Sequence, residues 1–159
     1  MQLSAVIEDL YMFNEAGDMP ARIRAAAAAG LKKVEFHMWN QVDLDAVAAA
    51  LKETGVQLLS ITVGPRVGCV DRSKTAFITE ALERTIAACR RLGATDMVIA
   101  GGPALKDVSA AEQHAAMVHN LKHLAPVAAA AGMRLLLEPL NTRIDHPTFF
   151  MASAIEGLD

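Results

Sequence analysis

Glu138 is the residue whose position in this sequence most clearly indicates chemistry, because it directly follows three leucines at positions 135–137. A carboxylate at the end of a buried apolar strand is held where its neighbours can make it a proton-transfer base or the ligand of a metal ion. The alternative is a solvated glutamate at a strand end with no chemical role. Glu138 is therefore the strongest candidate for a reactive group.

A second group of polar side chains follows the short apolar segment that begins at residue 33. His37 and Trp39 can line a polar pocket there, with the aromatic ring covering a small substrate. In the alternative interpretation, His37 is a structural histidine and Trp39 packs against a loop. Both interpretations stay open from the residues alone.

A pair of histidines, His119 and His123, has the spacing of four residues with which helices bind zinc. The two side chains face away from the apolar positions of their predicted helix, and a third ligand is missing. We therefore interpret them as part of a solvated helix face. The two cysteines, Cys69 and Cys89, form no CxxC motif and are expected to be reduced thiols.

Short apolar segments alternate along the chain with longer segments of helical periodicity. Asp43 can cap a helix that Gly55 ends, and Ser109 with Glu112 has the pattern of a capping box. The predicted strands are residues 3–7, 33–37, 56–63, 96–100 and 134–138. The predicted helices are residues 18–30, 43–55, 73–92 and 109–132, with a kink or break before Pro126, and a last helical segment that starts at Pro147.

The strands are almost continuously apolar, which is typical of a parallel sheet covered by helices. An open doubly wound sheet and a part of a (β/α)8 barrel both fit this alternation. The sequence has no G-x-G-x-x-G motif after its first strand and no P-loop motif. A complete barrel needs about 250 residues, whereas this chain has 159. We expect one α/β domain, residues 1–159, with about five parallel strands and outer helices.

The composition argues against two classes of partner. The formal net charge is −3 and no segment gathers lysine or arginine, so nucleic acid is not an expected partner. No apolar run approaches the roughly 20 residues that span a bilayer, and no basic leader precedes residue 13. We therefore expect a cytoplasmic protein that contacts no membrane.

The segment LLLEPLNTRIDHPTFF, residues 135–150, resembles the strand-five signature of hydroxypyruvate isomerases within the xylose isomerase-like TIM barrels. The segment VEFHMWNQVDLDAVAAAL, residues 34–51, is similar to strand two and helix two of the same group. The resemblance covers nearly the whole chain and implies the N-terminal five β/α units of a partial TIM barrel. It also implies an enzyme that uses Mg²⁺ or Mn²⁺ and interconverts an aldehyde and a ketone of a small sugar or keto acid through an enediolate.

The resemblance also assigns roles to single residues. It makes Glu138 a metal ligand and a catalytic glutamate, and it places His37, Trp39, Asn141 and Arg143 near the substrate. The other metal ligands of the family, an Asp, a His and a second Glu, come from strands six to eight. We therefore expect the lone chain to bind metal weakly or not at all and to be inactive.

Two other functions remain as alternatives, a non-catalytic half-barrel interaction protein and a metal hydrolase of the apurinic-site endonuclease type. A basic groove and more histidine ligands would favour the endonuclease, and the sequence has neither. An unclosed barrel leaves the strands at residues 3–7 and 134–138 with unpaired edges and exposes apolar side chains. We therefore expect a homo-oligomer.

Overall fold

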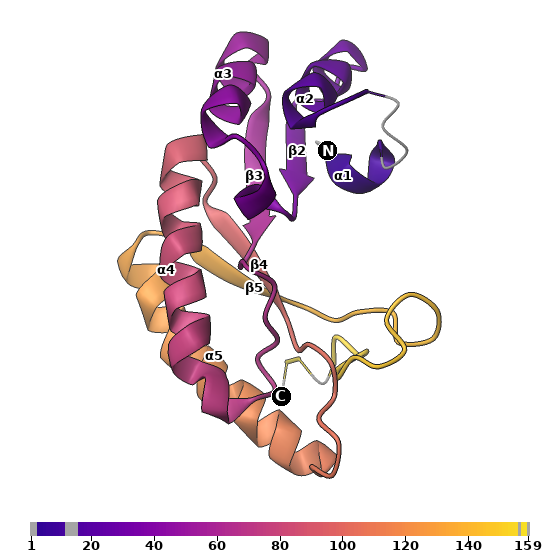
Figure 1. Ribbon diagram of the computed structural model, residues 1–159, viewed down its shortest axis with the longest axis vertical. Coiled ribbons are helices and arrows are strands. Elements are labelled where there is room, and N and C mark those ends of the chain that lie inside the picture. The colour runs from indigo at the N-terminus through magenta and orange to yellow at the C-terminus, as the bar shows by residue number, and fades with distance from the viewer. Residues whose placement is uncertain (1–2, 12–15, 156, 159) are drawn as a thin grey trace.

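The computed structural model describes residues 3–11, 16–155 and 157–158, and its centre is one five-stranded sheet. All strand pairs are parallel, and the strand order is β1-β2-β3-β4-β5 (Figure 1). The strands are β1 (Ser4–Val6), β2 (Lys33–Phe36), β3 (Gln57–Thr62), β4 (Asp96–Ala100) and β5 (Arg134–Glu138). A doubly wound sheet would change direction at a switch point, so this sequential order confirms the predicted part of a TIM barrel.

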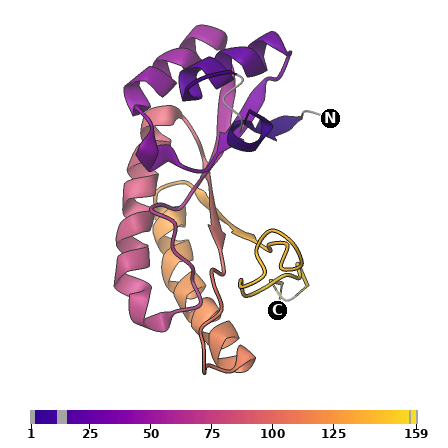
Figure 2. The same ribbon diagram turned by 45° about the vertical axis from the view of Figure 1, so that its right-hand side comes forward.

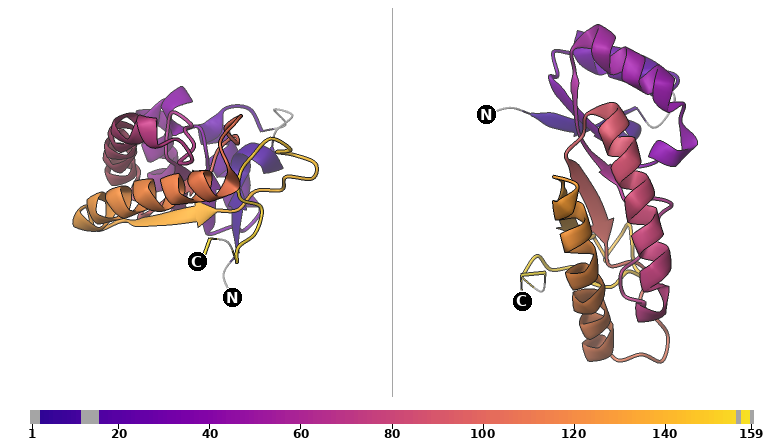
Figure 3. Two further views of the ribbon diagram at one scale, coloured as in Figure 1. Left: turned by 90° about the horizontal axis from the view of Figure 1, so that it is seen from below. Right: turned by 90° about the vertical axis from the view of Figure 1, so that its left-hand side faces the viewer.

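Helices cover one face of this sheet. They are α1 (Ile7–Leu10), α2 (Met19–Ala28), α3 (Leu44–Thr54), α4 (Thr75–Leu92) and α5 (Ala110–Ala130), with short 3-10 helices η1 (Trp39–Gln41) and η2 (Arg72–Lys74). The long helices α4 and α5 run side by side, and the segment after β5 lies on the other side of the sheet (Figures 2 and 3). Within the described ranges, no helix is long and apolar enough to cross a membrane.

The helix boundaries follow from local side-chain chemistry. The Asp43 carboxylate accepts hydrogen bonds from two backbone N–H groups in the first turn of α3, which Gly55 ends in a left-handed conformation. Gly93 ends α4 in the same way. At the start of α5, Ser109 and Glu112 form the predicted capping box. Both ends of α3 and the start of α5 are therefore fixed by residues that the sequence indicated.

The predicted helix does not break before Pro126, which lies inside α5. The helix predicted to start at Pro147 is wrong. No helix follows Pro147 up to residue 155, because the backbone there pairs with the loop after β4 instead. The N–H of Ala104 donates to the Thr148 carbonyl at 2.7 Å, and that of Phe150 donates to the Gly102 carbonyl at 2.9 Å.

The strands present two different faces. Phe36, Ile61 and Met97 are paired across three strands, are at most 1% exposed, and face the helices. The opposite face carries the row Ser60, Asp96 and Arg134 and the row Thr62, Val98 and Leu136. Leu136 is 39% exposed although it lies within a strand. This second face is the side that a closed barrel would turn inward.

Candidate functional site

A cavity of about 410 Å³ lies at the carboxyl ends of the strands, where β/α proteins place their reactive groups. Its wall combines the ends of β3, β4 and β5 with the loops that follow them. The lining residues are Asp9, His37, Thr62, Val63, Arg66, Val67, Gly68, Ile99, Ala100, Gly102, Pro103, Glu138, Leu140, His146 and Phe149. The cavity thus brings acidic, basic and apolar side chains from five segments to one place.

Glu138 is the last residue of β5, paired in register with Ala100 of β4, and its half-buried side chain faces the cavity. Within residues 3–11, 16–155 and 157–158 its carboxylate has no hydrogen-bond or ion-pair partner. A strand-end carboxylate that no protein group neutralises is available to a substrate or a cation. The geometry therefore leaves Glu138 free to react.

His37 follows β2 and turns its imidazole into the same cavity. Its Nδ1 lies 2.8 Å from the Thr62 hydroxyl, and its Nε2 lies 3.8 Å from the Asp9 carboxylate. When Nδ1 accepts from the hydroxyl of Thr62, Nε2 carries the ring hydrogen and can donate it within the cavity. The hydrogen bond to Thr62 thus orients the imidazole, and the Asp9 carboxylate lies near its other nitrogen.

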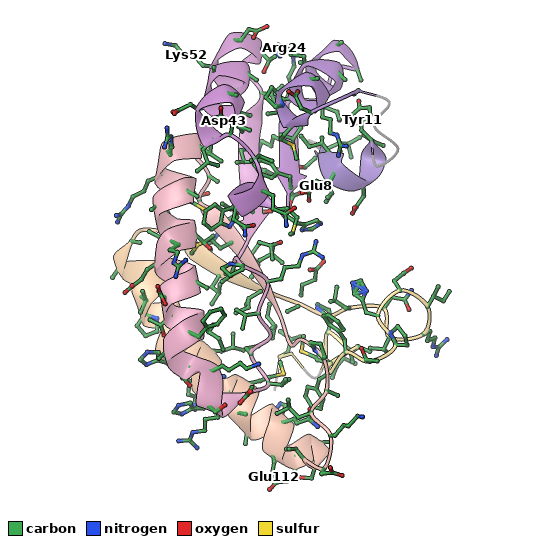
Figure 4. The ribbon with its side chains drawn as sticks, in the orientation of Figure 1. Glu8, Tyr11, Arg24, Asp43, Lys52 and Glu112 are labelled. Atoms are coloured by element: carbon green, nitrogen blue, oxygen red, sulfur yellow. The ribbon has the colours of Figure 1, made fainter. Side chains whose placement is uncertain are left out.

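Glu8 holds the turn on which His37 stands. Its two carboxylate oxygens accept hydrogen bonds from the backbone N–H groups of His37 at 2.6 Å and Met38 at 3.0 Å, and Figure 4 shows it beside this turn. Glu8 directly follows the strand predicted at residues 3–7, but the sequence gives no sign of this backbone contact. Because both oxygens are occupied, Glu8 acts as a support of the turn.

Three of the predicted substrate residues lie outside the cavity wall. Trp39 is only 8% exposed, and its indole N–H donates to the Thr62 carbonyl at 3.0 Å. Asn141 is exposed and accepts from the backbone N–H of Arg143 at 3.0 Å, which closes a turn in the loop after β5. Glu138 and His37 are therefore the two predicted residues that the structure brings together, and a substrate contact of the other three stays a prediction.

Sequence reasoning missed three charged or titratable residues of the cavity wall, namely Asp9, Arg66 and His146. Each lies on a segment that follows a strand, which is the signal that could have identified them. The imidazole of His146 stacks at a tilt on Phe149, with ring centroids 4.9 Å apart. That contact fixes the ring at the edge of the cavity.

The loop between β3 and α4, which forms one wall, is anchored at several points. The N–H of Gly64 donates to the buried Thr85 hydroxyl at 3.1 Å, and that of Cys69 donates to the Ala100 carbonyl at 3.3 Å. The fully buried Asn120 of α5 donates its side-chain amide to the Cys69 carbonyl at 2.8 Å. The backbone of this loop is therefore tied to both β4 and α5.

Glycines let this loop touch the loop after β4. A Cβ atom on Gly68 would lie 2.4 Å from both the carbonyl oxygen of Gly101 and the Cα of Gly102. Gly102 has a φ of +89°, a conformation that other residues rarely adopt. The two backbones thus meet without side chains between them, and this glycine contact closes one side of the cavity.

The two cysteines take no part in this chemistry. Burial raises the pKa of Cys69 to about 11 and that of Cys89 to about 12. Both thiols are therefore protonated near neutral pH, whereas a nucleophilic cysteine needs its thiolate.

A complete metal site is not formed by the described part of the chain, in which no three His, Cys, Asp or Glu side chains cluster to hold an ion. Glu138 is a hard oxygen donor of the kind that Mg²⁺ and Mn²⁺ prefer. It provides one carboxylate, whereas these ions take about six ligands. The donors of the described residues thus fit one part of such a site and not the whole.

Comparison with known proteins gives relatives over most of the chain. A family model described as xylose isomerase-like TIM barrel matches residues 23–159. The human protein named "Putative hydroxypyruvate isomerase" is 34% identical over 154 residues, which cover 89% of this chain and 55% of that protein. This chain therefore spans about half the length of the curated relatives it matches.

Two crystal structures share the fold at low sequence identity. The AP endonuclease, family 2, from Brucella melitensis has a TM-score of 0.87 at 22% identity, over 99% of this chain and 62% of that one. The IolI protein with a binding zinc atom has a TM-score of 0.77 at 15% identity, over 99% of this chain and 56% of that one. At these identities the likeness concerns the fold alone.

Proposed function

Because this chain belongs to the xylose isomerase-like TIM barrel family, we propose that it supplies Glu138 and His37 to an active site that interconverts an aldehyde and a ketone, as in a hydroxypyruvate isomerase. The observation that carries this proposal is the carboxylate of Glu138, which no described residue pairs and which shares a cavity with the oriented imidazole of His37. The names of the curated relatives support the reaction class.

The proposed reaction moves one hydrogen between adjacent carbons, and Glu138 is the base. Its carboxylate removes a proton from the carbon that carries the hydroxyl group, and the electron pair of that C–H bond forms the enediolate. The hydroxyl proton passes to the former carbonyl oxygen, and the carboxyl group returns its proton to the neighbouring carbon. Atoms and electrons balance without an oxidant.

His37 stabilises the oxygen on which negative charge develops. Its Nε2–H is directed into the cavity when Nδ1 accepts from Thr62, so it can donate to an enediolate oxygen. Glu8 fixes the backbone from which the imidazole projects. In this proposal Glu138 moves the proton, and His37 donates a hydrogen bond from a fixed position.

A divalent ion, Mg²⁺ or Mn²⁺, remains part of the proposal, with Glu138 as one ligand. When bound, such an ion would polarise the substrate oxygens. Since the described donors do not complete a metal site, we derive no step through it. We also propose that the chain alone gives no appreciable isomerase turnover, because its described donors do not hold the ion that full turnover requires, although Glu138 can still remove a proton slowly.

A partial reaction tests the role of Glu138 without requiring full turnover. In D₂O, proton removal and return exchange the hydroxymethyl hydrogens of hydroxypyruvate, and proton NMR follows their loss. We expect exchange above the buffer rate with the wild-type chain and about 100-fold slower enzyme-dependent exchange with Glu138→Gln, the usual range for loss of a general base. Equal rates for both proteins would contradict the proposal.

The matched control is Glu112→Gln. Glu112 is an exposed glutamate at the start of α5, far from Glu8 and the turn after β2 (Figure 4). A glutamine can still accept the hydrogen bonds of the capping box. This variant should therefore exchange hydrogen at the wild-type rate.

A further inference from the structure

We propose that Arg66 binds a carboxylate of the substrate, so that the cavity selects a small 2-oxo or 2-hydroxy acid over a neutral sugar. This inference rests on the proposed function, which leaves both substrate classes open. It assigns the choice between them to one side chain. Among the described residues that line the cavity, Arg66 is the one arginine or lysine.

Arg66 is a cation that has no partner among the described residues. It lines the cavity together with Glu138 and His37, and its exposed side chain forms no hydrogen bond or ion pair with any described residue. Arg24 and Arg134, in contrast, are each held by a carboxylate through two nitrogens. Arg66 thus keeps its five N–H donors for a ligand, and their planar fork matches a carboxylate.

The backbone that carries Arg66 is fixed. Gly64 is bonded to Thr85 on one side, and Gly68 and Cys69 are held against the β4 end on the other. Only three residues, 65–67, lie between these anchors. A side chain on so short and anchored a segment has a defined origin, which lowers the entropy lost when it binds a ligand.

The charges of the cavity favour a monoanion over an anion of higher charge. Arg66 contributes one positive charge, whereas Asp9 and Glu138 contribute carboxylates to the same wall. A carboxylate carries one negative charge and can pair with the guanidinium, while a phosphate carries more charge and would meet stronger repulsion from the two acids. The chemistry of the wall therefore favours a carboxylic acid over a phosphorylated sugar.

The size of the cavity also fits a small acid. Its volume is about 410 Å³, and a water molecule takes about 30 Å³ of liquid. A three-carbon acid therefore fits with room for several waters in the cavity that Arg66 and Glu138 both line.

Binding of two probes of nearly equal size tests the inference. Hydroxypyruvate and dihydroxyacetone both contain a hydroxymethyl ketone. Hydroxypyruvate carries a carboxylate where dihydroxyacetone carries a second hydroxymethyl group. The imidazole C–H signals of His37 and His146, which both line the cavity, report binding in an NMR titration of the full chain. We expect the wild-type chain to bind hydroxypyruvate at least tenfold more tightly, the value of one charge-assisted hydrogen-bond pair.

Two variants distinguish a specific contact of Arg66 from a general effect of positive charge near the cavity. Arg66→Gln should lower the ratio of the two affinities to about one, mainly by weakening the binding of hydroxypyruvate. Arg72→Gln removes the same charge from an exposed position in η2, outside the cavity lining, and should keep the wild-type ratio. Circular dichroism confirms that each variant is folded.

Several outcomes would overturn the inference. They are equal affinities in the wild-type chain, an unchanged ratio in Arg66→Gln, the absence of shifts with both probes, and tighter binding of inorganic phosphate than of hydroxypyruvate. The hydrogen exchange assay keeps the two proposals apart. Glu138-dependent exchange without acid selectivity refutes only the role of Arg66, whereas acid selectivity without Glu138-dependent exchange refutes only the isomerase.

Discussion

Replacing Asn120 by aspartate should destabilise the fold in a pH-dependent way. Asn120 is 0% exposed, and its amide donates to the carbonyls of Cys69 at 2.8 Å and Asp71 at 3.2 Å. Aspartate has almost the same shape but, when ionised, donates no hydrogen bond. The substitution Asn120→Asp therefore places a carboxylate oxygen against two carbonyl oxygens in a buried position.

The size of the loss follows from these contacts. Two hydrogen bonds at about 1 kcal/mol each are lost. The Thr75 hydroxyl, which donates to Asn120 Oδ1 at 2.6 Å, can still donate to the carboxylate, but burying the charge adds several kcal/mol. We expect the free energy of unfolding to fall by about 4 kcal/mol at pH 7. That is a large part of the roughly 5–15 kcal/mol by which domains are stable.

Protonation should recover part of this loss. Burial raises the pKa of the introduced carboxyl in the folded state above its unfolded value of about 3.9. The stability difference from wild type is therefore smallest below that value and grows as the pH rises through the folded-state pKa. At low pH the neutral carboxyl also donates one hydrogen bond, so the loss should shrink to about 2 kcal/mol.

Urea denaturation followed by circular dichroism at pH 4 and pH 7 measures both quantities. Gln57→Glu makes the same amide-to-carboxyl change at an exposed position in β3 and should lower stability by less than about 0.5 kcal/mol at either pH. A loss for Asn120→Asp that is below about 1 kcal/mol, or that is equal at the two pH values, would refute the reasoning.

Three further predictions concern other parts of the molecule. Gly68→Ala should lower the free energy of unfolding by about 3 kcal/mol, because its Cβ would lie 2.4 Å from the backbone of the neighbouring loop. Gly93 has open space around it but a φ of +77°, so Gly93→Ala should cost about 1 kcal/mol. Equal losses in the two variants would contradict the steric argument. Cys69 and Cys89, with pKa values raised to about 11 and about 12, should react with a thiol reagent at pH 8 only as fast as the chain unfolds, and rapid reaction of the native protein would show an accessible thiolate. The chain should self-associate at micromolar concentration in sedimentation through the face that carries Leu136, and Leu136→Asp should weaken this association; a wild-type monomer at all concentrations would exclude it.

The strands and helix ends were predictable because their signals are local. The segments 96–100 and 134–138 are strands with the predicted bounds, and Asp43, Gly55 and the capping box at Ser109 act as predicted. Capping depends on groups two or three residues away, and strand identity depends on a continuous apolar run. Such features are contained in a short window of sequence.

The segment after β5 was not predictable in this way. Pro147 is typical of a helix start, yet Thr148 accepts a hydrogen bond from the loop after β4 and Phe150 donates one to it, although that loop lies about 45 residues earlier in the chain. A partner so distant in sequence leaves no local signal. The helix prediction failed because tertiary pairing replaced the helical hydrogen bonds.

The candidate site was predictable in part for the same reason. Glu138 and His37 follow strands directly, so their place at the cavity could be inferred from the alternation of elements. Arg66 and His146 stand inside loops, where side-chain direction depends on contacts such as the one between Gly68 and Gly102. Trp39 also follows a strand, but its indole N–H turned to the Thr62 carbonyl.

The glycine contact has an evolutionary consequence. Every missense codon at Gly68 adds at least a Cβ atom, so we expect a mutational scan to find that position intolerant in any selection for folded protein. Arg66 is two residues away and exposed, so its codon can change without loss of the fold. Within one short loop, the codon of Gly68 would thus be constrained by the fold, and the codon of Arg66 by the substrate. The substrate preference could change during evolution while the fold stays the same.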